Sequence, residues 1–416
     1  MRKFAYALLA SIGAAGGLLF ATHTEAAGTS FARIERGRHL VDAGDCAGCH
    51  TAAKGKPFAG GRPIPTPFGV IDAPNITPDR QTGIGGWSDE DFYRAMHLGQ
   101  GPDGERLYPA FPYPYYTKLT RDDVMAMRAY LNTIQPVKNK VRGNHLAFPL
   151  NYRVVMRGWD LVFFHPGTFK PDRSKSAEWN RGAYLVQGAG HCGACHTPKN
   201  ALGADEDSKA LLGSEVQNWF APKIAGNMHD GTGSWSVDAI VEYLKTGRNK
   251  HSGAAGPMAE VVKDSTSKLP DSDLRAIATY IKAVNGGPST TASKPAEKIM
   301  ITGKAIYADS CSGCHQADGK GVPRMFPPLE HDANVQQQDP TTVIRVILSG
   351  ARTVATDKRP TPFAMPAYDW KLKDDEVAAV ASYVRNAWGN SAPTVTPDQV
   401  SSLRQTLHKS RTTGGS

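Results

Sequence analysis

Cysteine is scarce in this sequence and occurs only within one repeated motif. The chain has six cysteines in 416 residues, and all of them belong to three copies of Cys-x-x-Cys-His. The copies are Cys46-Ala-Gly-Cys49-His50, Cys192-Gly-Ala-Cys195-His196 and Cys311-Ser-Gly-Cys314-His315. No cysteine is left over for a separate disulfide framework or for a lone reactive thiol.

Other absences exclude further classes of protein. Beyond the N-terminus, the best candidate for a membrane span, Val154 to Phe164, is short and contains Arg157 and Asp160. The formal net charge of +9 comes from basic residues spread along the chain, so nucleic acid is not an expected partner. A nucleotide-binding glycine fingerprint and a convincing acid–base constellation are also missing, so we expect no substrate-oxidising site in this chain.

The repeated motif has the spacing of a c-type haem attachment site. Two thiols on one helical turn can add across the two vinyl groups of a porphyrin, and the adjacent histidine can present an imidazole nitrogen to the iron. The sequence therefore predicts three covalently bound haem c groups. The attachment residues are Cys46, Cys49, Cys192, Cys195, Cys311 and Cys314, and the proximal iron ligands are His50, His196 and His315.

Three other uses of paired cysteines explain less of the sequence. Six disulfide-bonded cysteines would leave the three histidines without a role. A zinc ribbon places its second pair about 15–20 residues after the first, whereas these motifs begin at residues 46, 192 and 311. A thioredoxin-like redox pair would be single and would follow a strand.

The N-terminus has the composition of a secretory signal peptide. Residues 1–26 contain a basic start (Arg2 and Lys3), an apolar run and a small-residue exit. The competing interpretation is a membrane anchor, because the apolar run approaches the roughly 18 residues that a span requires. The Gly, Ala and Ser residues in the run and the cleavage-like site after it favour removal. Export also agrees with haem attachment, which takes place outside the cytoplasm.

Each motif lies inside a longer repeated pattern. A segment with helical apolar spacing and one glycine precedes each motif, and a segment with an acidic first turn and a tyrosine closes each unit. The glycines are Gly37, Gly182 and Gly303, and the tyrosines are Tyr130, Tyr280 and Tyr383. We expect the two helices of each unit to cross closely, with the glycine against the tyrosine. This arrangement resembles the small helical fold of class I cytochromes c, so the predicted fold class is all-α with three tandem domains.

The repeat divides the chain into seven parts. They are a signal peptide (1–26), cytochrome c domain 1 (27–140), a packed connecting segment (141–177), cytochrome c domain 2 (178–285), a linker (286–298), cytochrome c domain 3 (299–390) and a C-terminal tail (391–416). The aromatic residues of the connecting segment predict that it packs across the domains. The helical apolar spacing in the tail favours a short packed helix over a lipid-binding one.

The first two domains are more alike than either is to the third. Ala73-Pro74-Asn75-Ile76 in domain 1 recurs as Ala221-Pro222-Lys223-Ile224 in domain 2. Domain 3 has Phe326-Pro327-Pro328-Leu329 instead.

A methionine often provides the second axial ligand of the iron in electron-carrying cytochromes. Proline-containing loops before the closing helices of domains 2 and 3 contain Met258 and Met365, and we expect both to ligate iron rather than to fill the core. Phe111 occupies the corresponding place in domain 1, and phenylalanine cannot ligate iron. The remaining candidates in domain 1 match ordinary helix positions of the other domains; they are Met96, Met125, Met127 and His97. We therefore expect the first haem to be five-coordinate or to have a ligand that the sequence does not identify.

The three motifs in this order resemble the three-haem cytochrome c subunit of membrane-bound bacterial alcohol, gluconate, sugar and aldehyde dehydrogenases. Further similar segments are Tyr108 to Pro114, Trp179 to Gly182 and Gly190 to Pro198. The resemblance covers nearly the whole mature chain, although many members have methionine at the position of Phe111. It implies peripheral attachment to the periplasmic face of the inner membrane, beside a dehydrogenase subunit carrying PQQ or flavin and a small third subunit. Electrons would pass from that dehydrogenase subunit through this chain to ubiquinone.

Three other functions compete with this interpretation. A free periplasmic carrier would deliver electrons to an oxidase and would purify without a large partner. A haem peroxidase would use an open coordination position in domain 1. A subunit of a terminal oxidase would usually have spanning helices, which the mature sequence lacks. The sequence does not identify the substrate that the dehydrogenase partner oxidises.

Overall fold

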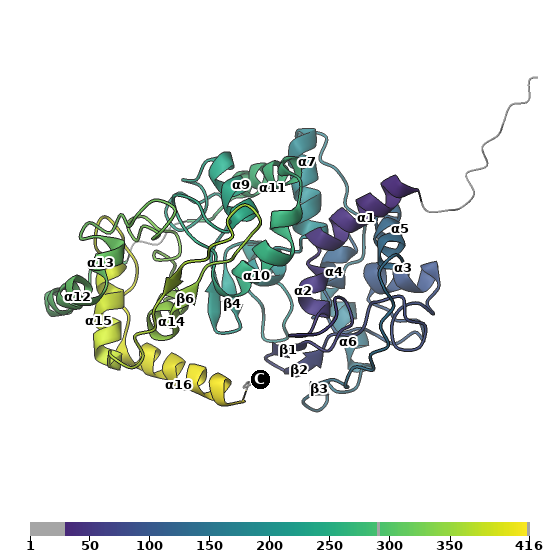
Figure 1. The fold of residues 1–416 in the computed structure, drawn as a ribbon, viewed down its shortest axis with the longest axis horizontal. Coiled ribbons are helices and arrows are strands. Elements are labelled where there is room, and N and C mark those ends of the chain that lie inside the picture. The colour runs from purple at the N-terminus through teal and green to yellow at the C-terminus, as the bar shows by residue number, and fades with distance from the viewer. Residues whose placement is uncertain (1–29, 289–291, 414–416) are drawn as a thin grey trace, which may run out of the picture.

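A computed structural model describes residues 30–288 and 292–413, and the predicted signal peptide lies outside these residues. The described residues form mainly helices, with a few short strands between them (Figure 1). The first part of the chain contains α1 (Phe31–Ala43), α2 (Cys46–His50), β1 (Pro63–Thr66), β2 (Gly69–Asp72), α3 (Asp89–Leu98), α4 (Tyr113–Tyr116), α5 (Arg121–Leu131), β3 (His145–Leu146) and α6 (Val155–Phe163). Side-chain caps define several of these helix starts: Ser88 and Asp91 form a capping box on α3, and Thr120 caps α5.

The rest of the chain repeats this pattern twice, with variations. The second part contains α7 (Ala177–Tyr184), η1 (Leu185–Ala189), α8 (Gly193–His196), η2 (Asp207–Lys209), β4 (Ser214–Val216), β5 (Trp219–Ala221), α9 (Val237–Thr246), α10 (Gly256–Asp264), η3 (Thr266–Lys268) and α11 (Asp271–Ala283). The third part contains α12 (Glu297–Ser310), α13 (Ser312–His315), α14 (Thr341–Ser349), β6 (Ala351–Arg352), β7 (Ala364–Met365), α15 (Asp374–Val384) and α16 (Pro397–Thr413).

The strands qualify the expectation of a purely helical fold. β1, β2 and β3 form an antiparallel sheet, and β4–β5 and β6–β7 form two separate pairs. Gly69 allows the close approach of β2 to β3, because a Cβ atom at this residue would lie 2.2 Å from the carbonyl oxygen of His145. The described residues are therefore mainly helical, with short hairpins in the loops between the helices.

The helix crossings follow the predicted glycines. A Cβ atom would lie 1.9 Å from the Ala126 carbonyl oxygen at Gly37, 1.9 Å from that of Ala276 at Gly182, and 2.2 Å from that of Ala379 at Gly303. Only glycine therefore fits where α1 crosses α5, where α7 crosses α11 and where α12 crosses α15. The predicted tyrosine contact is also present at two crossings, those of Tyr280 and Tyr383, while the nearest atoms to Gly37 belong to Ala126 and Met127 rather than to Tyr130.

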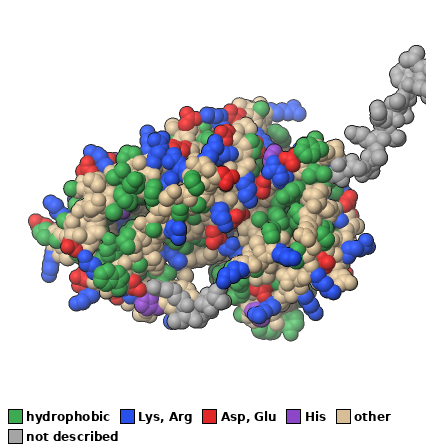
Figure 2. Space-filling model, viewed as in Figure 1, with side chains coloured by type: hydrophobic (Ala, Val, Ile, Leu, Met, Phe, Trp, Pro, Cys, Tyr) green, Lys and Arg blue, Asp and Glu red, His purple; other side chains and the backbone are tan. Residues whose placement is uncertain are grey.

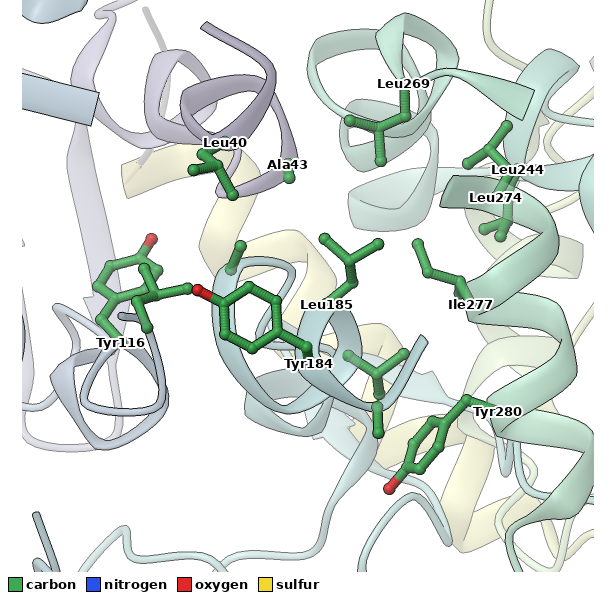
Figure 3. Packing of buried hydrophobic residues seen from close by; sticks show 14 of the residues in the cluster. Leu40, Ala43, Tyr116, Tyr184, Leu185, Leu244, Leu269, Leu274, Ile277 and Tyr280 are labelled. Atoms are coloured by element: carbon green, nitrogen blue, oxygen red, sulfur yellow. The ribbon is translucent and has the colours of Figure 1, made fainter. Parts of the chain in front are cut away.

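The first and second parts share one hydrophobic core (Figure 3). Leu40 of α1, Leu185 of η1 and Ile277 of α11 all belong to this cluster. Buried polar contacts accompany it, because the hydroxyl of Tyr184 donates to the Asp123 carboxylate and also accepts the Thr120 backbone N–H at 3.1 Å. The two parts are therefore packed against each other over a continuous interior.

The connecting segment contacts both neighbours. The hydroxyl of Tyr113 donates to Asp160 of α6 at 2.5 Å, which fixes the helix on the first part. The indole N–H of Trp159, also on α6, donates to the Leu202 carbonyl oxygen of the second part at 2.9 Å. The segment packs across the two parts, in line with its aromatic content.

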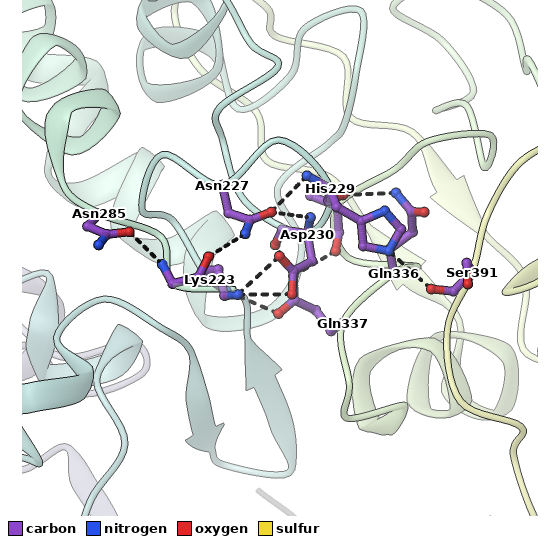
Figure 4. Close-up of polar contacts among 10 residues, drawn as sticks. Lys223, Asn227, His229, Asp230, Asn285, Gln336, Gln337 and Ser391 are labelled. Carbon is purple, nitrogen blue, oxygen red and sulfur yellow. Dashed lines mark hydrogen bonds and ion pairs between the residues drawn. The ribbon is translucent and has the colours of Figure 1, made fainter. Parts of the chain in front are cut away.

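A buried polar network joins the second and third parts (Figure 4). The Lys223 ammonium lies 3.0 Å from the Asp230 carboxylate, and both side chains are buried. The Gln337 side-chain amide donates to the Asp230 carbonyl oxygen at 2.5 Å, and that of Gln336 donates to the His229 carbonyl oxygen at 2.9 Å. A buried polar group without a hydrogen-bond partner destabilises the folded protein. These paired contacts therefore favour one fixed arrangement of the two parts.

The C-terminal helix α16 packs on the third part. Val400 and Leu407 are buried in the hydrophobic cluster of α14 and α15, and Leu403 packs against it. The expectation of a packed terminal helix is therefore confirmed. Within residues 30–288 and 292–413, no helix has both the length and the apolar composition that a bilayer span requires.

Candidate functional site

Each Cys-x-x-Cys-His motif occupies a short helical turn after a long helix. The turns are α2, α8 and α13, which follow α1, the continuous helix formed by α7 and η1, and α12. All six cysteines have free thiols. Burial raises the pKa of Cys49 to about 11 and that of Cys192 to about 12. Neither thiol has the lowered pKa that marks the activated thiolate of a catalytic cysteine.

The three motif histidines are oriented in the same way. The Nδ1–H group of His50 donates to the Pro74 carbonyl oxygen at 2.7 Å, that of His196 to Pro222 at 2.7 Å, and that of His315 to Pro327 at 3.0 Å. Because a carbonyl oxygen only accepts, the proton must lie on Nδ1.

Burial lowers the pKa of each motif histidine, so the neutral imidazole with a lone pair on Nε2 is favoured. A neutral ring held through its other nitrogen is the usual state of a metal-ligating histidine. The donor set of each motif, two thiols and one oriented imidazole, therefore fits haem c.

Sequence reasoning missed the three proline carbonyl groups, although the segments that contain them are visible as a repeat. Ala73 to Ile76 and Ala221 to Ile224 share a pattern to which the sequence alone assigns no role. The structure places the proline of each segment against the motif histidine. The repeat itself was the signal that could have identified them.

The structure places Phe111 and Met258 in equivalent positions. A backbone bridge joins Gln100 to Arg106 in the first part and Arg248 to Gly253 in the second. Phe111 lies five residues after Arg106, and Met258 lies five residues after Gly253. Both side chains are half-buried and pack against the shared hydrophobic core. Phe111 packs edge-on against Tyr116, with 5.4 Å between ring centroids.

Met365 lies in the third part at the end of a strand rather than in a helix. It belongs to β7, which pairs with β6, and its side chain is half-buried. Its loop reaches the second part, because the Arg248 guanidinium lies 4.4 Å from the ring centroid of Phe363. Val354 of the same loop packs with Ala254 and Val262, and Met258 lies against this small cluster. Met258 lies in the first turn of α10 rather than in the expected loop. The start of α10 and the loop before Met365 are therefore in contact.

The other candidate iron ligands of the first part are occupied in packing contacts. Met96 on α3 and Met127 on α5 are 4% and 1% exposed and lie in the shared core. Met125 packs against the same core from α5. His97 stacks on Tyr93 at 5.0 Å between centroids, one helical turn away on α3.

The first and second motifs are close neighbours. The Nε2–H group of His191, the residue before Cys192, donates to the Gly44 carbonyl oxygen at 3.2 Å, two residues before Cys46. Tyr116 donates to the same oxygen at 3.2 Å, and its ring lies 5.7 Å from the His191 ring. The second part thus contacts the first through its motif, and the third through Arg248 and the residues around Met258 on α10.

Asp45, directly before the first motif, has a strained backbone conformation and a buried carboxylate. Its backbone is left-handed, with φ 47°, and its Oδ1 atom is buried with no hydrogen-bond partner among the described residues. The pKa of Asp45 is raised to about 7, chiefly by burial and also by the neighbouring carboxylates Asp264 and Glu260, while Arg62 and Lys268 oppose the shift. The ionised carboxylate therefore destabilises the folded protein.

We expect Asp45→Asn to stabilise the protein at high pH only. The folded pKa of about 7 lies above the unfolded value of about 3.9. The stability contribution of Asp45 is therefore present below pH ~4 and is lost as the pH rises through about 7. Asparagine tolerates φ > 0 and carries no charge, so the unfolding free energy at pH 8 should rise by about 1–3 kcal/mol.

Urea unfolding of the haem-loaded protein at pH 4, 6 and 8 measures this effect. Asp103→Asn, at an exposed loop carboxylate, is the matched control and should not change the pH dependence. If Asp45→Asn followed the wild-type curve at every pH, Asp45 would not be the destabilising group.

Comparison with known proteins identifies the family. The cytochrome c family model matches residues 34–135, 180–285 and 301–388. The gluconate 2-dehydrogenase cytochrome c subunit of Pantoea cypripedii is 38% identical, over 90% of this chain and 90% of its own length. The cytochrome c subunit of the quinone-dependent alcohol dehydrogenase of Gluconobacter oxydans is 38% identical, over 97% of this chain and 88% of its own length.

A third relative is longer. One of the subunits of the nicotinate dehydrogenase of Pseudomonas putida is 42% identical over 88% of this chain, but the chain spans only 31% of that protein's length. Cytochrome c domains imply covalently bound haem c, which agrees with the donor sets described above. The chain therefore belongs to the cytochrome c family and is a relative of the cytochrome c subunits of gluconate and alcohol dehydrogenases.

Proposed function

We propose that this chain is the electron-transfer subunit of a membrane-associated dehydrogenase complex. It holds three haem c groups, receives electrons from a dehydrogenase subunit that carries PQQ or flavin, and passes them to ubiquinone. The observation that carries this proposal is the threefold recurrence of a Cys-x-x-Cys-His turn whose histidine is held by a proline carbonyl oxygen. Relatives named as cytochrome c subunits of dehydrogenases support the same role.

In this proposal, each of the three parts of the chain forms one class I cytochrome c-like domain. The domains are residues 27–140, 178–285 and 299–390, with 141–177 as a packed connector, 286–298 as a linker and 391–416 as a tail. Residues 1–26 form a signal peptide that directs the chain to the periplasm. The mature protein then lies at the periplasmic side of the inner membrane with its dehydrogenase partner and a small third subunit.

The residues of the chain have separate tasks in this function. The six cysteines attach the cofactor, and each motif histidine presents Nε2 because its Nδ1–H is occupied by a proline carbonyl oxygen. Met258 and Met365 supply the second axial ligand in domains 2 and 3, while Phe111 supplies none in domain 1. Haem c, when bound, provides a one-electron redox couple whose potential depends on its axial ligands and on burial. One cysteine of each motif packs against a hydrophobic cluster: Cys46 and Cys192 against that of the first two parts, and Cys311 against that of the third.

We expect Cys192→Ser combined with Cys195→Ser to remove one of three haems. Serine cannot form a thioether, so the second motif loses covalent attachment while the other two motifs keep theirs. Haem content per polypeptide, measured by the pyridine haemochrome assay on denatured protein, should fall from three to two. Ser310→Ala, a change beside the third motif that spares its thiols, is the control and should keep three haems. A wild-type content other than three would contradict the proposed haem count.

Purification from native membranes tests the function. The chain should copurify in mild detergent with a dehydrogenase subunit, and one of alcohol, gluconate, fructose or nicotinate should reduce its haems. A short-chain ubiquinone should then reoxidise them. A chain that purifies alone and is not reoxidised by the quinone would instead be a free carrier, and peroxide turnover by the purified protein would indicate a peroxidase.

A further inference from the structure

The connecting segment exposes an unusual number of large apolar side chains. Phe148 is 81% exposed, Leu161 is 85% exposed and Val162 is 61% exposed. Tyr152 and Val154 are also exposed, and the rings of Phe148 and Tyr152 are in contact at 6.3 Å between centroids. Exposed apolar patches of this kind mark an interaction surface rather than ordinary solvent exposure.

These residues form one side of α6 and the turn before it. Residues 154, 157, 158, 161, 162 and 165 recur at helical spacing, and all of them are exposed. The opposite side of the helix is buried, with Met156 at 4% and Asp160 at 7% exposure. The buried side already fixes α6 on the protein through the Tyr113–Asp160 and Trp159–Leu202 hydrogen bonds. The outer side is therefore presented on a rigid helix and is not needed for folding.

The part of the chain that carries this face is mainly basic, although the carboxylate of Asp79 lies near Lys138 at its start. Residues 138–170 contain six basic side chains, all exposed: Lys138, Lys140, Arg142, Arg153, Arg157 and Lys170. The single carboxylate in this stretch, Asp160, is buried and accepts a hydrogen bond from Tyr113. Figure 2 shows hydrophobic side chains together with Lys and Arg at the lower right of the molecule, where Figure 1 places β3 and α6.

We propose that the outer face of α6 and the turn 148–154 bind the surface of an anionic phospholipid bilayer. Apolar side chains that insert between the headgroups, flanked by cations that attract anionic lipid, are the two components of interfacial membrane binding. The structure thus assigns the membrane contact to the connecting segment and not to α16, whose apolar residues are buried in the third part. This inference rests on the proposed function, since it specifies the surface through which the electron-transfer subunit reaches the membrane.

Vesicle flotation with the full haem-loaded chain tests the proposal. Phosphatidylcholine vesicles with and without phosphatidylglycerol are the probes, and the wild type should bind more tightly when phosphatidylglycerol is present. The double change Leu161→Asn and Val162→Ser should weaken binding roughly tenfold to both kinds of vesicle, because it removes the inserted apolar area. Arg157→Gln should weaken binding roughly fivefold to vesicles that contain phosphatidylglycerol, and not to the others.

Matched controls exclude a general effect of surface substitution. Ile301→Ser and Trp370→Ser replace apolar residues of the third part that are 63% and 82% exposed, and they should bind vesicles as the wild type does. The haem spectrum and haem content of every variant should be unchanged, which shows that folding is intact.

Two results would overturn the proposal. One is wild-type vesicle binding by the Leu161→Asn and Val162→Ser variant. The other is a variant that keeps vesicle binding but no longer copurifies with the dehydrogenase subunit, which would identify the face as a protein interface. In detergent, substrate-driven haem reduction should be equal in wild type and variants. Its absence in the wild type would count against the proposed function and leave the vesicle result standing.

Discussion

Replacing Met258, the axial ligand that we propose for the second haem, with leucine is expected to lower the midpoint potential of that haem by on the order of 100 mV, because a thioether ligand raises the potential of haem iron. Leucine is close to methionine in volume, so the packing of residue 258 against the hydrophobic clusters is largely kept. Spectroelectrochemical titration of the full chain measures the shift. The long-wavelength band of methionine–iron coordination in the oxidised protein should lose part of its intensity at the same time.

Three further variants separate ligation from packing. Met365→Leu should lower a second midpoint potential in the same way. Met127→Leu, at a buried methionine of α5 that is 1% exposed, should leave all three potentials unchanged. Phe111→Met should add intensity to the methionine band and raise the remaining potential, because Phe111 lies at the position that Met258 occupies in the second part. A methionine band that survives in the Met258→Leu, Met365→Leu double variant would show that domain 1 already has a methionine ligand.

Local sequence signals predicted the elements that depend on one short segment. The glycines before the motifs predicted the helix crossings. Glycine destabilises a helix, so its presence between helical neighbours indicates a close contact that a side chain would prevent. The acidic first turns predicted α5, α11 and α15, which begin at Arg121, Asp271 and Asp374. The spacing of Val400, Leu403 and Leu407 predicted the packed helix α16. In each case the physical cause lies within a few residues of the signal.

Contacts between distant segments were not predictable from this one sequence. The strands β1 and β2 are only four residues each, and β2 is completed by β3, which lies more than seventy residues later in the chain. The bond from His191 to Gly44 depends on how two complete units pack, and neither residue has a distinctive sequence pattern. The proline carbonyl oxygens were also not predicted, because every residue has a backbone carbonyl group and the side chain does not show which of them accepts a hydrogen bond.

Gly182→Ala is expected to cost about 3 kcal/mol of unfolding free energy, near the upper end for overpacking in a core. The new Cβ atom would lie 1.9 Å from the Ala276 carbonyl oxygen and 2.8 Å from the Tyr280 Cβ atom. The first of these is a backbone atom inside α11, so no side-chain rotation relieves the clash and the two helices must separate. Because α7 and α11 also line the core shared with the first part, the separation should loosen both parts. Urea unfolding of the haem-loaded protein measures the loss.

The chain offers a control in which the same substitution has the opposite sign. Gly158 lies inside α6, and a Cβ atom there would meet nothing within 4 Å. Alanine is favoured over glycine in a helix by about 1 kcal/mol, so Gly158→Ala should raise the unfolding free energy slightly. The pair separates the helix preference of alanine from the steric cost of the crossing. Equal effects of the two substitutions would mean that α7 and α11 are not held at the distance that Gly182 permits.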